Sequence, residues 1–544
     1  MKTVLFNGKI YVEKGTYADA VLIEDGIFKA VGTEAEVMAA AGEGCEKIDC
    51  EGRTVIPGLN DTHVHLMWVG ELLQRAQISK ARSMKGLIEI CQDFMAEHPD
   101  RVENGMFAMG WNQDLFDDEK RIPDRHDLDK ISTEIPILLE RVCGHIAITN
   151  TKTLEMLGLD ASTPEVPGGE IRREADGYPN GIFTENALGV AKAIMKKPTM
   201  AQRRGYLLEG MNYAVAHGLT SVQSNDIGAL GSGGEMDDLF AMFRELFESG
   251  DALTRFHHQI TFRSPAEFEH YLTEGEFAKY GGQYPEGSWL TLGPLKLFKD
   301  GSLGGRTALM SNGYVGAPDV KGVDCMTPED TAGFCALAKK YGVQMMTHSI
   351  GDEAIRQVIA AYETAFIDGE NKLRHSINHC QITTQELLDA IVEKGILVQA
   401  QPIFIDYDRT VLEPLCGPEL AETSYNFGTL LRRGVHLSYG TDSPVENCNP
   451  FPNLYMAVTR KGADGTPEGG FYPKECVDVE TAIDAYTYES AYCQFMEDKK
   501  GRIKPGFYAD LVVLDKDIFT CDPMEIKDIL PVMTMVGGKV VFQK

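Results

Sequence analysis

The two ends of the chain alternate short apolar runs with turn-forming residues. Residues 3–55 carry turn signals such as Asn7-Gly8, and this spacing is typical of short antiparallel strands. Residues 509–515 and 535–542 repeat the pattern near the other end. Neither end supplies enough strands for a stable sheet of its own. We therefore predict one small composite β-sandwich domain, built from residues 1–54 and 500–544.

Between these ends the pattern changes to an apolar strand, a turn and a helix, repeated along the chain. One helix opens with the capping box Thr383-Thr384-Gln385-Glu386 and stops at Gly395, and an apolar strand follows at once. Such alternation is typical of βα units around a parallel sheet. The pattern thus predicts an α/β fold, a TIM-like (β/α)8 barrel, over residues 55–499.

Eight apolar segments are candidates for the barrel strands. They are residues 54–56 running toward His65, and residues 219–223, 255–261, 293–298, 343–347, 375–379, 396–401 and 435–439. The count closes a barrel only if residues 70–215 are an insertion after the first strand, which we expect to be a cap subdomain at the mouth. Alternatively, the strand-like segments 107–110 and 136–141 inside this insertion are the second and third barrel strands.

The composition excludes several classes of protein. The 544 residues are 43% hydrophobic and 24% charged, which suits a large buried core better than a disordered chain. A formal net charge of −29 repels nucleic acid and anionic membranes, and no basic patch or apolar run of membrane-spanning length offsets it. The N-terminus lacks a signal peptide's apolar core, and the twelve scattered cysteines form no Cys-x-x-Cys pair. We expect a cytoplasmic protein with a small-molecule partner, and a homodimer is left open.

Histidines and an aspartate stand where predicted strands end. His63 and His65 are two residues apart, so strand geometry points both imidazoles to one face. Alone, such a pair is as often a hydrogen-bonded polar pair as a pair of ligands. His348, His379 and Asp442 end three later strands, and the carboxyl ends of barrel strands meet at one active-site face. The set suits a divalent metal, with zinc as the default and manganese or iron as alternatives.

Lys296 lies within an apolar strand, where an uncompensated ammonium is costly to bury. Carboxylation by carbon dioxide would convert its amine into a carbamate anion that can bridge two metals. The alternative is a salt bridge to a neighbouring carboxylate such as Asp300. The histidines on the flanking strands favour the carbamate.

Several motifs surround these residues. They are Pro57-Gly58-Leu59-Asn60-Asp61-Thr62-His63-Val64-His65, Lys296 with Asp300-Gly301-Ser302-Leu303, His348 with Gly351-Asp352, His379, Asp442-Ser443-Pro444 and Lys504-Pro505-Gly506-Phe507-Tyr508-Ala509-Asp510-Leu511. The set resembles the amidohydrolase superfamily, and most of all its branch of N-substituted formamide deformylases, over nearly the whole chain. Lys299 departs from the pattern, where a small residue is expected. The resemblance implies two metal ions, zinc by default. His63, His65 and Asp442 would hold the more buried ion, a carboxylated Lys296 would bridge, and His348 and His379 would hold the second.

The predicted activity is hydrolysis of a carbon–nitrogen bond in an amide, N-acyl or N-formyl compound. A hydroxide between two divalent cations is nucleophilic near neutral pH, and Asp442 is placed to take its proton and deliver it to the leaving nitrogen. A cyclic amide is the nearest variant. A heterocycle deaminase is a second enzyme alternative, but it usually has one metal and no bridging lysine. From another class, a metal-binding barrel without turnover would act as a regulatory protein.

Three residues are candidates for substrate contact. Arg306 follows the Lys296 strand and would anchor a carboxylate or polarise a carbonyl, or else it is a solvated loop arginine. Trp111 and His145 lie in the predicted cap and would line the pocket if the cap folds over the mouth. Otherwise they are a packed aromatic and a hydrogen-bonded histidine. Glu185 is the weakest candidate.

Overall fold

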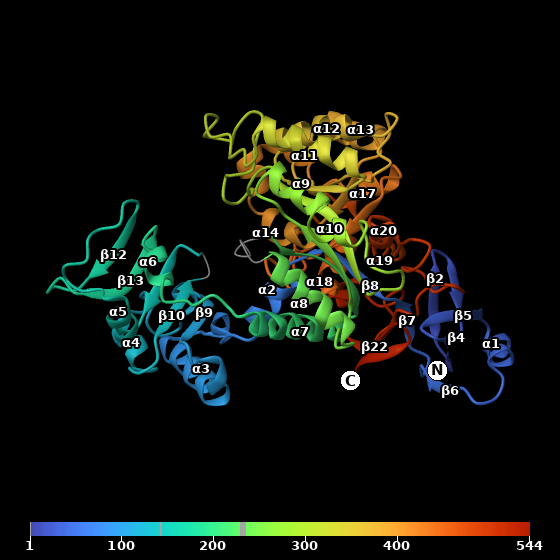
Figure 1. Cartoon of the computed structure of the whole chain (residues 1–544), viewed down its shortest axis with the longest axis horizontal. Helices are drawn as coiled ribbons and strands as arrows, with labels where there is room; N and C mark the ends of the chain where they lie inside the picture. The colour runs from blue at the N-terminus through green and yellow to red at the C-terminus, as the bar shows by residue number, and fades with distance from the viewer. Residues whose placement is uncertain (1, 142–143, 229–235) are drawn as a thin grey trace. The chain divides into compact units, whose positions relative to one another are not determined.

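A computed structural model describes residues 2–141, 144–228 and 236–544, and its largest sheet has eight parallel strands that nearly close into a barrel (Figure 1). In sheet order these are β20 (Leu437–Tyr439), β19 (Leu397–Ala400), β18 (Ser376–His379), β17 (Met345–Ser349), β16 (Leu290–Phe298), β15 (Arg255–Ile260), β14 (Leu219–Ile227) and β8 (Leu59–Val64). The two edges meet where the Asp442 N–H, just after β20, donates to the carbonyl oxygen of His63 at 2.7 Å. The predicted barrel is confirmed.

Helices alternate with the barrel strands. They include α8 (Met236–Glu248), α9 (Pro265–Thr273), α11 (Pro328–Tyr341), α12 (Asp352–Ala365), α13 (Gln385–Glu393), α17 (Phe427–Arg432) and α19 (Val479–Tyr486). In α8 the buried side chains of Leu239, Phe240, Phe243 and Leu246 recur at helical spacing, which gives the helix one apolar face for packing. Helix α13 begins after Thr384, whose hydroxyl accepts the Leu387 N–H and caps the first turn.

The first barrel strand runs toward His65 as predicted but begins later than Thr54. Residues Thr54–Pro57 form β7, which belongs to a sheet of the chain ends, and the barrel strand β8 begins only after Gly58. The break between the two strands is hidden in the sequence because the apolar run lies in β7, whereas β8 (Leu-Asn-Asp-Thr-His-Val) is mostly polar although all of its residues are buried. A side chain at Gly58 would collide with Thr220, whose Oγ1 lies 2.1 Å from the position that a Cβ would take.

Strands from both chain ends form two small sheets. One has the order β5 (Ile27–Gly32), β4 (Ala20–Glu24), β1 (Lys2–Phe6), β6 (Glu46–Asp49), and the other β23 (Lys539–Gln543), β22 (Pro531–Val536), β21 (Leu511–Leu514), β7, β2 (Lys9–Glu13), β3 (Thr16–Ala18). Antiparallel pairing of β21 with β7 sets Val512 opposite Ile56 and joins the ends. Leu5 and Leu511 share one buried core. The two ends therefore combine as predicted, and the domain limits of 1–54, 500–544 and 55–499 stay predictions.

Between β8 and β14 the chain forms a compact unit of its own, Met67–Gly210, hereafter the inserted unit. It contains α3 (Met84–Glu97), α5 (Thr151–Leu157) and a sheet of β12 (Gly169–Arg173), β13 (Pro179–Glu185), β11 (Ile146–Thr149), β10 (Ile137–Arg141) and β9 (Met106–Trp111). Segments 107–110 and 136–141 are therefore not barrel strands, because they lie in β9 and β10 and pair with each other. An insertion after the first barrel strand is confirmed, and its limits of 70–215 and its role as a cap stay predictions.

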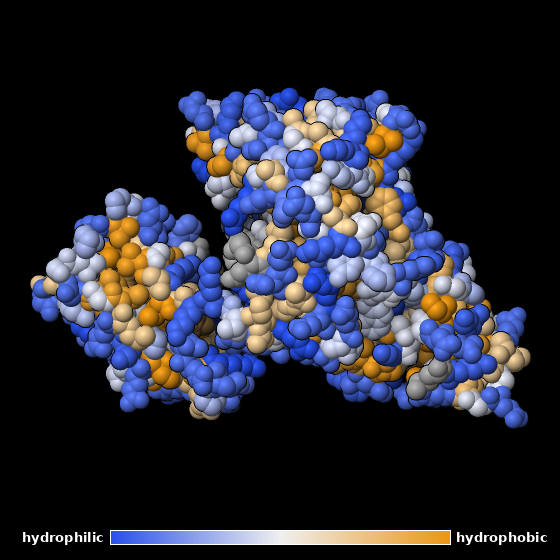
Figure 2. Space-filling view, in the orientation of Figure 1, coloured by the Kyte–Doolittle hydropathy of each residue, from blue (hydrophilic) through white to orange (hydrophobic). Residues whose placement is uncertain are grey.

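The visible surface of the protein is mostly hydrophilic (Figure 2), as a net charge of −29 leads one to expect. Within the described ranges, no helix combines the length and the apolar character that a membrane crossing requires. The eleven cysteines of the described chain are free thiols.

Candidate metal centre

Three of the predicted ligands meet at the carboxyl end of the barrel. His63 lies in β8, His65 directly follows it, and Asp442 follows β20 with a left-handed φ of 54°. The Nε2 atoms of His63 and His65 lie 3.2 and 3.5 Å from Asp442 Oδ1. Among the described residues, this trio is the only group of three or more His, Cys, Asp or Glu side chains close enough to hold one metal ion.

Hydrogen bonds on the far side of each ring orient these two imidazoles. His63 Nδ1 donates to Gln259 Oε1 at 2.6 Å, and His65 Nδ1 donates to the Asn225 carbonyl oxygen at 2.9 Å. A proton on Nδ1 leaves the lone pair on Nε2, the nitrogen that faces Asp442. Fixing the tautomer in this way is how proteins prepare histidines for metal binding. Gln259 and Asn225 were not predicted from the sequence.

His348 and His379 form a second pair on the neighbouring strands β17 and β18. Their ring centroids are 4.4 Å apart, and the His379 ring centroid lies 5.9 Å from that of His63. His348 Nε2 donates to the Gly301 carbonyl oxygen at 2.9 Å, so its lone pair is on Nδ1. His379 Nδ1 donates to Gln401 Oε1 at 2.8 Å, so its lone pair is on Nε2. The structure therefore brings all four predicted histidines together.

Lys296 points into this group from β16 and is fully buried. Burial lowers the pKa of its ammonium to about 7. In the described structure no carboxylate makes an ion pair with Nζ. Asp300 instead accepts the backbone N–H groups of Leu309, Ile350 and Gly351 at 2.8–3.0 Å. The alternative of a Lys296–Asp300 salt bridge is therefore wrong.

Asn378 is a further polar group in the centre that the sequence did not single out. One terminal atom of its side-chain amide lies 2.8 Å from His379 Nε2, 3.2 Å from His63 Nε2 and 3.3 Å from Lys296 Nζ. Its only signal in the sequence is its place next to His379 at the end of a predicted strand.

The protonation states suit metal binding. Burial lowers the pKa of His63 to about 4 and that of His348 to about 3, so both rings are neutral at pH 7. Burial alone would raise the pKa of the Asp442 carboxyl, but at the low pH where it titrates the imidazoles are protonated, and the charge and hydrogen bond of His63, with the bond from His65, hold that pKa well below its usual range. A divalent ion requires neutral imidazoles with converging lone pairs and an ionised carboxylate, so it would have to displace a proton from His65, whose pKa the Asp442 carboxylate raises in spite of burial.

Asp61 fastens β8 to the segment that carries Asp442. Its carboxylate accepts the backbone N–H groups of His63 and Thr441, each at 3.1 Å, and the Thr441 hydroxyl at 2.6 Å. Burial raises the pKa of Asp61 to about 7 in spite of these bonds. Since the two edge strands of the barrel carry the closest ligands, this link keeps them in register.

The candidate substrate residues have different surroundings. Trp111 is fully buried in a core of the inserted unit, where its Nε1 donates to the Leu139 carbonyl oxygen at 3.2 Å. Of the two alternatives, it is therefore the packed aromatic. In the same unit His145 is exposed and its Nδ1 lies 3.0 Å from Glu185 Oε2. Arg306 is exposed on the loop after β16, with a left-handed φ of 53°. Substrate contact by His145 and Arg306 stays a prediction.

Lys299, where the family motif leads one to expect a small residue, is buried under the loop after β16 and binds two of its residues. It is 3% exposed, its Nζ lies 2.6 Å from Asp324 Oδ1, and it donates to the Met326 carbonyl oxygen at 3.2 Å. The larger side chain is thus compensated by an ion pair, and the backbone N–H of Lys299 donates to the carbonyl oxygen of His348 at 3.0 Å.

Comparisons with known proteins agree with this geometry. The profile of the amidohydrolase family matches residues 46–542. Over the full length of both chains, this protein is 28% identical to YtcJ of Bacillus subtilis. It is 25% identical to the N-substituted formamide deformylase of Arthrobacter pascens, with 98% of this chain and 96% of that one covered.

Solved structures give the same result. An uncharacterized metal-dependent hydrolase from Pyrococcus horikoshii is 25% identical and superposes with a TM-score of 0.77, over 96% of this chain and 99% of the other. Together with a profile match that spans nine-tenths of the sequence, this likeness identifies the chain as a member of the amidohydrolase family.

Proposed function

We propose that this protein is a metal-dependent hydrolase that cleaves a carbon–nitrogen bond in an amide, N-acyl or N-formyl compound. The observation that carries the proposal is the pair of oriented histidines, His63 and His65, facing the carboxylate of Asp442. The full-length similarity to an N-substituted formamide deformylase supports the type of bond. The partner in this proposal is a small molecule. A cytoplasmic location and a homodimer stay predictions.

Two metal ions, zinc by default, would occupy the centre. His63, His65 and Asp442 would hold one, and His348 and His379 would hold the other through the nitrogens that carry their lone pairs. Lys296 would bridge them after its amine adds to carbon dioxide, which forms an N–C bond, releases a proton and leaves a carbamate anion. Lys296 is fully buried and makes no ion pair with the described carboxylates, which supports this modification.

When bound, divalent ions would supply a lowered pKa for a coordinated water and a polarised substrate carbonyl. The chain itself supplies a proton carrier. Asp442 is ionised at neutral pH and is held toward the centre by its link to β8, so its carboxylate can accept a proton from the attacking water. Passing that proton to the departing nitrogen completes the cleavage and returns Asp442 to its starting form.

The two alternative activities, hydrolysis of a cyclic amide and deamination of a heterocycle, differ in whether they need a bridging lysine. A cyclic amide would use the same residues, and only the shape of the pocket would differ. Deamination of a heterocycle usually requires one metal and no bridging lysine, so a fully buried Lys296 among four histidines favours amide hydrolysis.

The first test measures metal content per chain in protein purified without added metal, for the native sequence and for Lys296→Ala. We expect about two ions in the native protein and one or none in the variant. Lys500→Ala is the matched control, because Lys500 is also buried, with a pKa lowered to about 7, but donates to Ser221 Oγ at 2.6 Å away from the metal centre. The control should keep its metal.

A screen of N-formyl, N-acyl and cyclic amides on the loaded protein then identifies the bond that is cleaved. A protein that binds no metal, even after reconstitution with zinc, manganese or iron, would overturn the proposal and favour a regulatory role. Loaded protein that deaminates heterocycles but leaves every amide intact would overturn the assignment of the bond.

A further inference from the structure

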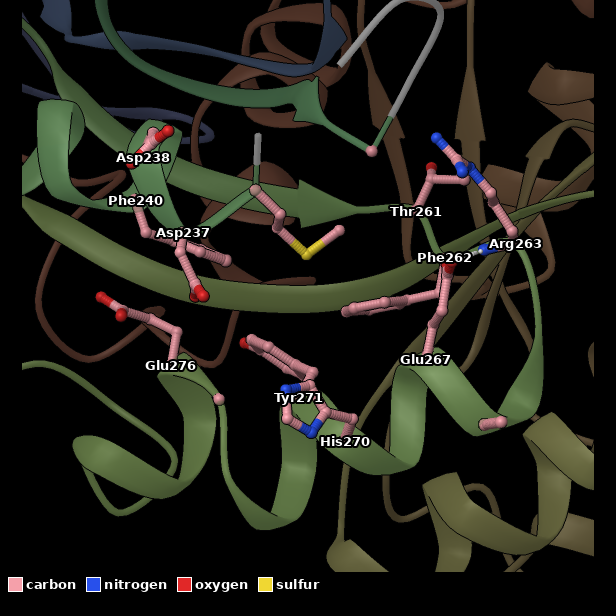
Figure 3. Close-up of a pocket in the computed structure, with 14 residues that line it drawn as sticks. Asp237, Asp238, Phe240, Thr261, Phe262, Arg263, Glu267, His270, Tyr271 and Glu276 are labelled. Atoms are coloured by element: carbon pink, nitrogen blue, oxygen red, sulfur yellow. Dashed lines mark hydrogen bonds between the residues drawn. The ribbon is translucent and has the colours of Figure 1, made fainter. Parts of the chain in front are cut away.

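A cavity bounded by α8, α9 and α10 (Glu276–Lys279) has a volume of about 550 Å³ (Figure 3). Two of its carboxylates are already paired, because Arg244 binds Glu276 and the Lys279 ammonium lies 3.9 Å from Asp237. These carboxylates therefore give no sign of a ligand. A smaller cavity, near the starts of the barrel strands, has a charge that is not paired.

This smaller cavity lies at the amino-terminal ends of the strands, whereas the metal ligands lie at the carboxyl ends. Its volume is about 10 Å³, which is room for about one water molecule. Its lining comes from β14, β15 and β16 and from the chain between α20 (Tyr488–Tyr492) and β21, and includes Ser221, Arg255, Thr291, Gln494, Lys500 and Tyr508. Among the described residues that line it there is no aspartate or glutamate.

Lys500 brings a buried ammonium to this cavity. The residue is 5% exposed, and its Nζ donates to Ser221 Oγ at 2.6 Å. In the described structure this hydroxyl oxygen is the only hydrogen-bond acceptor of Nζ, although an ammonium has three N–H groups to donate. Burial, together with the nearby charge of Arg255, lowers the pKa of Lys500 to about 7. Two of its N–H groups are thus left without an acceptor.

The carboxylate of Asp510 does not neutralise Lys500, because Arg255 already binds it. Arg255 Nε and Nη2 donate to the two carboxylate oxygens at 2.7 and 3.1 Å, and the Gly537 N–H donates to Oδ1 at 2.8 Å. Arg255 and Asp510 form a neutral pair, and within the described ranges no carboxylate makes an ion pair with Lys500. The charge of the Lys500 ammonium is therefore uncompensated.

Two further side chains at the cavity have N–H groups without an acceptor in the part of the chain that the structure describes. Gln494 is 7% exposed, and its Oε1 accepts a hydrogen bond from Asn60 Nδ2 at 2.8 Å, which leaves its Nε2 unpaired. Arg255 is 6% exposed and uses Nε and Nη2 on Asp510, which leaves its Nη1 unpaired. Neither nitrogen is completely enclosed, so a ligand in the cavity can reach them. Since amide and guanidinium N–H groups only donate, the missing partner is an acceptor.

We propose that this cavity binds one halide ion, chloride or bromide. The ion accepts N–H groups from Lys500, Gln494 and Arg255, and its negative charge neutralises the Lys500 ammonium. A water molecule would accept hydrogen bonds from some of these groups but would leave the buried charge uncompensated. Oxyanions such as sulfate and phosphate are too large for a cavity of this volume. The site is independent of the proposed hydrolysis, and no covalent step is involved.

The halide would join β14 and β15 to the chain that leads to β21, so its binding should stabilise the fold. The test measures the melting temperature of the full, metal-loaded chain while sodium chloride replaces sodium methanesulfonate at a constant ionic strength of about 300 mM. We expect a rise of about 2 °C in the native protein. Lys500→Met should show no rise. Its melting temperature without chloride should be no lower than that of the native chain, because an uncompensated buried charge is removed.

Lys299→Met is the matched control. Lys299 is equally buried, but its ammonium is paired with Asp324 at 2.6 Å. The control should melt at a lower temperature than the native protein because this ion pair is lost, yet its melting temperature should rise with chloride as the native one does. An equal rise in the native protein and in Lys500→Met would overturn the proposal, because the ion would then act elsewhere, such as at the metal centre.

Diffraction locates the ion directly. Crystals of the native protein soaked in sodium bromide should show an anomalous peak beside Lys500 Nζ, and crystals of Lys500→Met should not. A peak without any chloride-dependent rise in melting temperature would mean an adventitious ion only and would overturn the proposal. The absence of a peak beside Lys500 would also overturn it, since the cavity would then hold water. If Lys500→Met folded poorly, the bromide map of the native protein would still decide.

Discussion

The histidines of the metal centre and His258 are buried in the same barrel but have opposite surroundings. In the metal centre each ring has one nitrogen bonded to a protein oxygen, and the nitrogen with the lone pair turns toward the other ligands. His258 in β15 differs. His258 has no hydrogen-bond partner on either nitrogen within the described residues and packs edge-on against Phe240, Phe243 and Phe256.

Burial does not distinguish the metal-centre histidine His63 from His258. The pKa of His63 is lowered to about 4 and that of His258 to about 3, in both cases mainly by burial. What distinguishes them is direction, because His63 has an oriented ring and a carboxylate facing it, whereas His258 has only aromatic neighbours. A buried neutral histidine is therefore a ligand only where a second group fixes its tautomer and a third converges on its lone pair.

The largest effect expected from this comparison is on turnover. Asp442→Asn removes the negative charge that faces both imidazoles and the group that carries the proton, so kcat/KM for an amide identified in the screen should fall about 10³-fold. His258→Phe should change kcat/KM less than about threefold, because its ring meets only aromatic side chains. A large loss in His258→Phe with normal folding would break the comparison.

The groups that orient the rings should have an intermediate effect. Gln401→Leu removes the acceptor of His379 Nδ1–H, and the affinity for the second metal should fall about 10- to 100-fold in a chelator competition assay. Gln399→Leu is the matched control. Gln399 lies two residues earlier in β19, is equally buried and bonds Ser376 instead of a ligand. Equal losses of affinity in both variants would show that packing, and not ring orientation, sets the affinity.

The sequence predicted the ligands because of where they stand. His63, His348 and His379 come at the carboxyl ends of apolar strands, and such ends share one face of a barrel whatever their separation along the chain. The orienting residues carried no such signal. Gln259 is 196 residues from His63 in sequence, and a glutamine in a buried strand has many ways to be satisfied.

The prediction of the fold was limited in the same way, because some features depend on tertiary contacts that leave no signal in the sequence. The alternation of strands and helices was sufficient to predict the barrel, but the start of β8 was missed because four of its six residues are polar even though the whole strand is buried. Trp111 was predicted from its position in the insertion alone. Whether an aromatic side chain packs in a core or lines a pocket depends on tertiary contacts, here with the core of the inserted unit, that periodicity does not encode.

The smallest effect expected is on stability and depends on pH. Because burial holds the folded pKa of His258 at about 3, the unfolded chain binds more protons between about pH 3 and 6.5, and folding stability is lost as the pH falls through that window. His258→Phe removes this pH-dependent contribution to the unfolding free energy. Between pH 7 and 5 the variant should lose about 2 kcal/mol less unfolding free energy than the native chain in urea titrations. Equal losses would mean that His258 is already protonated in the folded barrel, and the contrast with the oriented histidines would then fail.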